Sequence, residues 1–427
     1  MSILTKYRKN ALKKFFRTID IPDSLETVAD IDHAQEVDPV TVGLTSTATD
    51  TIWDATQDLY RSGVYPLLSL CVRRQGEIIL NRSLGYSRDE QVASINTPVC
   101  MFSASKAVSA VLIHLLAEQG EIHLLDPVSY YIPQFAAKGK GSISILQLLS
   151  HRGGIPSIPQ GTDVSLLFDH DKALQLICEA ESDDHHGRIQ AYHAITSGFI
   201  IAELIRVTTG MSAQQFLNRY ISKPMGMRYF RYGLTKRDQA QVALNAVTGA
   251  NIGAINNGLK SIMGADPDEI VEITNDARFY QSIIPSANLF ATAEEVSRFF
   301  QMLLNHGQWQ GKQILQPLTV YKATRSIGKA ELDKSLMMPM RYSPGFMMGG
   351  SPYGIYGPNS QYAYGHLGFA NIMCWSDPER DIAVSIMNTG KLALGPHLKS
   401  LPALIGSIAG ECEPCVDLEG DVPVYSR

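Results

Sequence analysis

The pattern of apolar positions divides the chain into strand-like ends and a helical middle. LLSLCVRRQGEIILNRSLGY (67–86) predicts two strands around a turn at Arg74-Gln75-Gly76, because two short apolar runs flank a glycine. FANIMCW and DIAVSIMN predict a second strand pair with a turn at Asp377-Pro378. Helical periodicity dominates between residues 101 and 285. We therefore expect an α+β fold: an antiparallel β-sheet assembled from both chain ends and flanked by helices, with an inserted all-helical lobe.

Helix and turn signals set the predicted borders. A helix over DTIWDATQDLYRSG ends at Gly63, and LKSLPALIGSIAGEC closes the domain as a helix. We assign residues 51–410 to one domain, with an α/β part (51–100 and 286–410) and a helical lobe (101–285). Residues 21–50 are acidic and weakly periodic, which predicts a linker or a surface-wrapping arm. Residues 411–427 form a C-terminal tail.

Residues 1–20 have the pattern of a basic amphipathic helix. Apolar residues recur at helical spacing, and the basic residues cluster on the other side, at Lys6, Lys9, Lys13 and Arg17. Such a helix can lie on an anionic membrane surface, dock on the protein or act as a transit peptide. It lacks the continuous apolar core of a secretory signal, and no stretch of about 18 apolar residues occurs elsewhere. We therefore expect a cytoplasmic protein, with peripheral membrane contact through residues 1–20 as an open alternative.

The net charge bears on nucleic-acid binding, and the cysteine contexts bear on the redox state of the thiols. The net charge of −5 gives no basic field for nucleic acid, so we expect no nucleic-acid partner. Most of the six cysteines lie in apolar contexts, which is typical of buried reduced thiols. Cys412 and Cys415 form a CEPC pair with no second pair to match. We interpret that pair as incidental, and a metal or redox role stays open.

Ser103 and Lys106 are the first candidate catalytic pair. They lie one turn apart in MFSASKAVSAVLIHLLAEQG (101–120), where an apolar helix begins. A serine hydroxyl needs a base to become nucleophilic, and a desolvated lysine can be that base. Free N–H groups at a helix start can also stabilise an oxyanion. The alternative is a helix-capping serine beside a solvated lysine. Ser326-Ile-Gly-Lys329 has the same spacing, but Gly328 interrupts it and no sustained apolar run follows.

Two further segments carry candidate chemistry. Tyr192 precedes the apolar helix 195–207, where a phenol can move a proton between a serine and a leaving group. In YGHLGFAN, His366 and Gly368 stand at a strand start; the glycine allows close approach of a substrate, and the Phe369 amide can be a second oxyanion donor. The alternatives are a packed tyrosine and a surface histidine at a turn.

The order of these segments resembles the serine β-lactamase and penicillin-binding-protein superfamily, and more narrowly class C β-lactamases and class VIII esterases. Segments 124–133, 143–156, 221–227 and 283–307 also resemble that superfamily, so the likeness spans about residues 50–410. It implies an α/β sandwich with a helical lobe and an active site between them. It implies that Ser103 is acylated, Lys106 accepts its proton, Tyr192 shares the base and acid roles, and the Ser103 and Phe369 amides form the oxyanion hole. It implies no metal or organic cofactor.

The chain departs from the β-lactamase pattern at two motifs. Y-x-N becomes Tyr192-His193-Ala194, which removes an amide side chain, and K-T-G becomes His366-Leu367-Gly368, which removes a fixed positive charge. Both changes favour neutral or lipophilic esters over anionic antibiotics and cell-wall peptides. We predict a serine hydrolase that cleaves small-molecule carboxylic esters. A β-lactamase, D-Ala peptidase or amidase on the same scaffold, and a non-catalytic membrane-associated scaffold, are the alternatives.

Overall fold

A computed structural model describes residues 16–159, 161–184, 186–250, 266–392, 394–416 and 418. Its largest sheet has eight strands, and every pairing within it is antiparallel. Across the sheet the order is β15 (Met347–Met348), β18 (Tyr364–Gly368), β19 (Ile372–Asp377), β20 (Ile382–Asn388), β3 (Leu67–Arg74), β4 (Glu77–Arg88) and β2 (Ala29–Ile31), with β5 (Gln91–Val92) paired to β4.

The sheet is assembled from both ends of the chain, as the sequence predicts. Strand β20 pairs with β3, which places residues 382–388 beside residues 67–74. The turn between β3 and β4 falls at Gln75 and Gly76, which both have positive φ angles (53° and 88°). The turn predicted at Asp377-Pro378 lies further along, because Asp377 still pairs with Ile382 and its buried carboxylate accepts the Glu379 amide.

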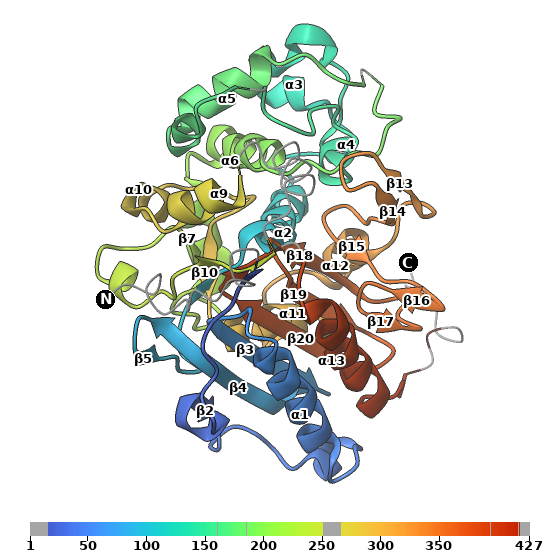
Figure 1. The fold of residues 1–427 in the computed structure, drawn as a ribbon. Helices are drawn as coiled ribbons and strands as arrows, with labels where there is room; N and C mark the ends of the chain where they lie inside the picture. The colour runs from blue at the N-terminus through green and yellow to red at the C-terminus, as the bar shows by residue number, and fades with distance from the viewer. Residues whose placement is uncertain are drawn as a thin grey trace.

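Every residue of β3 is buried, because helices cover both faces of the sheet. Helices α1 (Ala48–Arg61) and α13 (His397–Glu411) lie side by side on one face, and α11 (Ala293–Leu304) lies on the other (Figure 1). The sheet has a hydrophobic core on each face, and alternate β3 residues point into one or the other. Leu68 and Leu70 pack toward α1 and α13, whereas Leu67 and Cys71 pack with α11 and the helical lobe.

The helical lobe occupies the top of Figure 1. Its helices are α2 (Ser105–Glu118), α3 (Val128–Tyr131), α4 (Ile145–Leu149), α5 (His170–Glu179), α6 (Thr196–Thr209), α7 (Ala213–Leu217), α9 (Pro267–Thr274) and α10 (Ala277–Gln281). It is not entirely helical: it also contains the two-residue strands β7 (Arg231–Tyr232), β8 (Ala246–Val247) and β9 (Gly249–Ala250). Strand β7 pairs with β10 (Leu289–Ala291), which pairs with β6 (Val99–Cys100), so these short strands tie the lobe to the chain beside Ser103.

Shorter elements complete the described chain. They are β11 (Gln308–Trp309), β12 (Lys312–Gln313), α12 (Pro317–Thr324), β13 (Glu331–Asp333), β14 (Met338–Met340), β16 (Tyr353–Gly354), β17 (Gly357–Pro358) and β21 (Gly390–Lys391). Strand β21 pairs in parallel with β8, and β13 pairs with β14.

The N-terminal helix predicted over residues 1–20 lies outside the described residues up to position 15. The described end of that segment is not helical: Phe16–Arg17 form strand β1, which pairs with β9. Phe16 packs against the core under α1 and α13, so tertiary contact overrides the helical pattern here. Residues 21–50 include two 3₁₀ turns and strand β2 at the edge of the main sheet.

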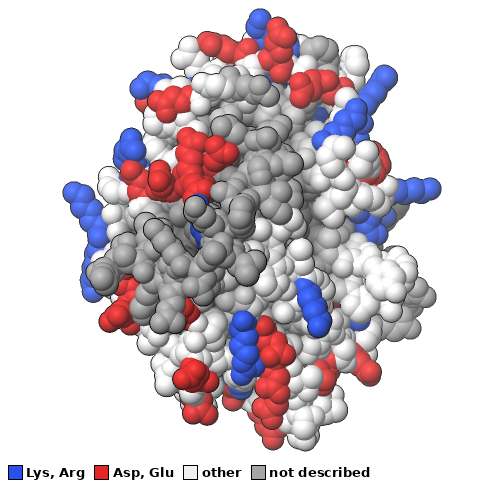
Figure 2. Space-filling model, viewed as in Figure 1, with Lys and Arg blue, Asp and Glu red and all other residues white. Residues whose placement is uncertain are grey.

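Within the described ranges, no helix is both long and apolar enough to cross a membrane. On the face seen in Figure 2, basic and acidic side chains are interspersed. The small net charge of −5 is therefore not gathered into one patch on this face.

Candidate active site

A tight bend before α2 presents Ser103. The Met101 amide donates to the Leu289 carbonyl (2.8 Å), which anchors the end of β6. Phe102 then takes a left-handed conformation (φ 48°), and residues 102–104 form a 3₁₀ turn that leads into α2. Such a conformation costs a non-glycine residue about 1–3 kcal/mol and is found where a site needs it. The bend leaves Ser103 partly exposed between buried neighbours.

Lys106 lies against Ser103, one turn further along. Its Nζ is 3.1 Å from Ser103 Oγ and also donates to the Ser286 carbonyl (3.1 Å). The side chain is buried, and this burial lowers the pKa of the amine well below its ordinary 10.5. A deprotonated amine at this position can accept the serine proton.

Tyr192 completes the cluster that the sequence predicts. Its ring centre is 4.9 Å from Lys106 Nζ, and its hydroxyl shares a hydrogen bond with Ser103. Burial raises the pKa of the phenol, so it keeps its proton at neutral pH, although the hydrogen bond partly offsets that rise. The structure thus brings a hydroxyl and an amine from one segment and a phenol from a distant segment to one place.

Strand β18 forms the neighbouring wall, next to the 3₁₀ turn of residues 102–104. A Cβ on Gly368 would lie only 2.4 Å from the Met101 carbonyl oxygen, so the close approach of the two segments requires glycine. The Phe369 ring packs on the Phe102 ring, with centroids 5.7 Å apart.

His366 on β18 is buried and neutral. Its Nδ1 is 2.7 Å from the Leu367 carbonyl and can only donate there, which leaves Nε2 as an acceptor. Within the described residues Nε2 has no hydrogen-bond partner. Burial lowers the pKa of the ring to about 3. The ring centre lies 6.0 Å from that of Tyr192, so an acceptor, not a cation, stands beside the cluster.

Asp333 supports Tyr192, and no sequence signal points to it. This fully buried carboxylate accepts the Tyr192 amide (3.0 Å), the Leu336 amide (2.9 Å) and the Tyr342 hydroxyl (2.9 Å). Its segment, ELDKS, is an ordinary polar stretch, and Tyr192 precedes it by about 140 residues. Only the tertiary contact reveals that Asp333 fixes the backbone of the tyrosine.

His151 and His193 pack behind Tyr192. The His151 ring centre is 4.7 Å from that of Tyr192, and its Nδ1 accepts the His193 amide (3.1 Å). His193 Nε2 accepts the Ile155 amide (3.3 Å), so this histidine of the altered Y-x-N motif ties the backbone together. Burial lowers the pKa of both rings, which keeps them neutral. His151 lies in segment 143–156, which carries part of the family resemblance, but the sequence assigns it no role.

The second S-x-x-K segment lies elsewhere. Ser326 Oγ donates to the Gly328 carbonyl (2.9 Å), and Lys329 is exposed. Over the described part of the chain, no group of three or more His, Cys, Asp or Glu side chains is placed to hold a metal ion.

Comparisons with known proteins identify the family and the fold. The family model described as Beta-lactamase matches residues 53–400. The "Esterase/beta-lactamase LipL" of Mycobacterium tuberculosis is 26% identical over 314 residues, which cover 70% of this chain and 71% of that protein. A penicillin-binding-protein homologue from Caulobacter crescentus has the same fold, with a TM-score of 0.74, 24% identity, and coverage of 86% of this chain and 99% of that one. A family VIII carboxylesterase superposes with a TM-score of 0.73, 23% identity, and coverage of 87% and 99%. The chain therefore belongs to the Beta-lactamase family of serine hydrolases.

Proposed function

We propose that this protein hydrolyses carboxylic esters through an acyl-enzyme on Ser103. The observation that carries the proposal is the contact between a partly exposed serine hydroxyl and a buried lysine amine 3.1 Å away, whose burial favours its neutral form. The esterase named among the relatives supports the same reaction class.

The proposed reaction begins when Ser103 passes its proton to Lys106 and Oγ attacks the ester carbonyl carbon. The carbonyl oxygen gains the negative charge, and the amides of Ser103 and Phe369 donate to it; one such donor is worth about 10²–10³-fold in rate. The C–O bond to the alcohol then breaks, and the alcohol oxygen takes a proton from Lys106 or Tyr192. A water molecule next gives a proton to the same pair and attacks the acyl carbon. The bond from that carbon to Ser103 Oγ then breaks, Oγ takes the proton back from the pair, and the carboxylic acid leaves.

Esters are favoured over β-lactams and peptides by what surrounds the cluster. His366 presents a neutral acceptor where the family motif has a lysine, so it offers no charge to a substrate carboxylate. Ala194 stands where the family motif has an asparagine, and its side chain has no donor for an amide carbonyl. An uncharged ester needs neither group.

The test is a panel of p-nitrophenyl esters, nitrocefin and a D-Ala-D-Ala peptide, run with Ser103→Ala, Lys106→Met and Lys329→Met. The first two variants should lose at least about 10³-fold in kcat for esters, because each removes a group that the chemistry uses. Lys329→Met removes the exposed lysine of the other S-x-x-K segment and should behave as the wild type. Folding of all four proteins is checked by circular dichroism.

Other results would point to other functions. Turnover of nitrocefin or of the peptide at rates matching the esters would favour a β-lactamase or peptidase. Near-full ester turnover by Ser103→Ala would refute the assignment of the nucleophile. Failure of a fluorophosphonate probe to label Ser103 in folded wild-type protein would favour the non-catalytic scaffold.

Peripheral membrane contact stays a separate proposal, which rests on the basic amphipathic pattern of residues 1–20. Removal of residues 1–15 keeps β1 intact and should abolish flotation with anionic liposomes. Equal flotation of the full and shortened chains would contradict it.

A further inference from the structure

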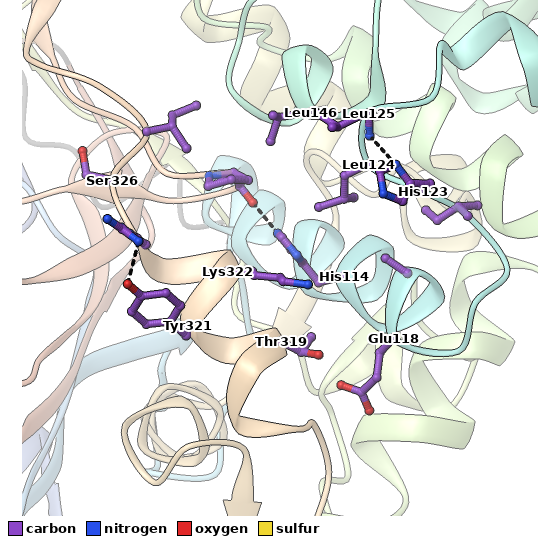
Figure 3. A pocket seen from close by; sticks show the side chains of 15 residues that line it. His114, Glu118, His123, Leu124, Leu125, Leu146, Thr319, Tyr321, Lys322 and Ser326 are labelled. Carbon is purple, nitrogen blue, oxygen red and sulfur yellow. Dashed lines mark hydrogen bonds between the residues drawn. The ribbon is translucent and has the colours of Figure 1, made fainter. Parts of the chain in front are cut away.

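A cavity lies beside α2, and none of the residues of the catalytic cluster lines it (Figure 3). It has a volume of about 600 Å³ and is enclosed by α2, α12 and the segments around residues 122–125 and 325–327. Neither Ser103, Lys106, Tyr192 nor His366 lines it. Its volume falls within the range of about 300–1,000 Å³ that small-molecule sites occupy.

The wall of this cavity is largely apolar. Ile122 and Leu146 contribute to it from the lobe, and Leu124 lies beside them. Leu125 at the rim is 65% exposed and Ile327 is 47% exposed. Large apolar side chains that converge on a concavity from separate segments are a feature of ligand sites, whereas single scattered ones are ordinary.

The charged groups of the cavity come from α2 and from α12 with the residue that follows it. Lys322 and Arg325 both project from the α12 side, and neither forms an ion pair with a carboxylate of the described residues. Arg325 donates to the Tyr321 hydroxyl (2.7 Å). Glu118, the acid of the cavity, projects from α2 (Figure 3), and its Oε2 accepts the Gln316 amide (2.9 Å) at the start of α12.

His114 lines the cavity from α2 and adds no charge. Its Nε2 is 2.8 Å from the Pro344 carbonyl and must donate there, while burial lowers the pKa of the ring to about 4. The nearby Lys322 also lowers that pKa.

We propose that this cavity binds an amphipathic monocarboxylate, a molecule with one anionic head and an apolar chain. Lys322 and Arg325 hold the carboxylate through charge-assisted hydrogen bonds. The chain lies against Leu124, Leu125 and Leu146. A neutral chain of the same length lacks the head contacts, and a polyanion would meet the Glu118 carboxylate.

The site is independent of ester hydrolysis. Lys106 precedes His114 by eight residues on the same helix, so the catalytic amine and the cavity are separated by roughly 12 Å at 1.5 Å rise per residue. Binding can therefore be measured in the Ser103→Ala protein, where no acyl-enzyme forms. Failure of the proposed esterase activity would leave this proposal standing, and the converse also holds.

The experiment titrates full-length Ser103→Ala protein with decanoate and with 1-decanol by isothermal titration calorimetry. Lys322→Met combined with Arg325→Met should weaken decanoate binding at least about tenfold, because charge-assisted contacts are lost, and should leave decanol binding within about twofold. Leu125→Glu, at an exposed position where folding is not at risk, should weaken both ligands. Lys329→Met, an exposed lysine outside the cavity, should change neither.

Three results would overturn the proposal: no decanoate binding at millimolar concentration, equal decanoate affinity with and without Lys322 and Arg325, or loss of binding when Ser103 of the wild type carries a fluorophosphonate adduct. The last would place decanoate in the catalytic site.

Discussion

Lys391 is another buried lysine, and its titration gives a quantitative prediction of how stability depends on pH. It is fully buried on β21, where Nζ donates to the carbonyls of Asn388 (3.0 Å) and Phe369 (3.3 Å) and lies 4.6 Å from the Phe102 ring centre. It thereby links the residue before Ser103 to the proposed oxyanion donor. No carboxylate of the described residues pairs with it, and burial lowers the pKa of the amine from 10.5 to about 7.

The sign and size of the effect follow from proton linkage. Between about pH 7 and 10.5 the unfolded chain keeps the Lys391 proton and the folded chain does not. The unfolded state then binds more protons, so the free energy of unfolding rises with pH across this window and is flat below it. At about 1.4 kcal/mol per pH unit, the whole window is worth about 5 kcal/mol.

Lys391→Met should remove this dependence. The stability difference, wild type minus variant, should rise by about 1.4 kcal/mol per pH unit between pH 7 and 9.5. Loss of the two carbonyl contacts destabilises the variant by the same amount at every pH. It therefore shifts the plot of the stability difference against pH but does not change its slope. Because Lys106 is present in both proteins, its own titration cancels.

The assay is urea unfolding followed by tryptophan fluorescence at five pH values from 6 to 9.5, with Lys329→Met as the exposed-lysine control. That control should give a flat difference. A flat or falling difference for Lys391→Met above pH 7 would refute the reasoning, because it would mean that the buried amine keeps its proton.

Three further predictions concern the catalytic cluster. Lys106 must be neutral to accept a proton, and burial lowers its pKa. We therefore expect kcat/KM for p-nitrophenyl butyrate to rise with pH along an acid limb and to level off below pH 10. An acid limb centred near pH 10.5 would show that Lys106 titrates as an ordinary lysine. Asp333→Ala should lower the unfolding free energy by about 2–4 kcal/mol in urea titrations, because the Tyr192 amide loses its acceptor. It should also reduce kcat more than it raises KM. An unchanged kcat would show that Asp333 does not position Tyr192 for catalysis. Gly368→Ala should cut kcat at least about tenfold, because the added Cβ would lie 2.4 Å from a backbone oxygen. The matched control is Gly406→Ala on α13, which has open space around it and should keep full activity in the same assay.

The parts of the fold that local pattern controls could be predicted from the sequence. The β3–β4 hairpin follows from two apolar runs around Gln75-Gly76, and α6 ends at Gly210 in the left-handed conformation expected of a helix stop. The pairing of Ser103 with Lys106 follows from helical spacing alone.

The remaining features depend on contacts between distant segments. Asp333 reaches Tyr192 across 141 positions, and Ser286 reaches Lys106 across 180. Two-residue strands such as β7 are too short to have a period, and Phe16 pairs with Ala250 although its own segment has helical spacing. Tyr192 could be joined to Ser103 and Lys106 only through the family resemblance.

The junction between β3 and β20 bears on how the chain matures during synthesis. One edge of β3 stays unpaired during synthesis until its partner strand β20, about 300 residues later in the chain, has been made. At about 5–20 residues per second, that wait lasts roughly 15–60 s. An unpaired edge in so apolar a strand favours association with other nascent chains, so it is a defined target for chaperones that bind unfolded chains. A nascent chain released before β20 emerges would lack the sheet centre on which β19 and β18 are built, and with them the wall beside the nucleophile.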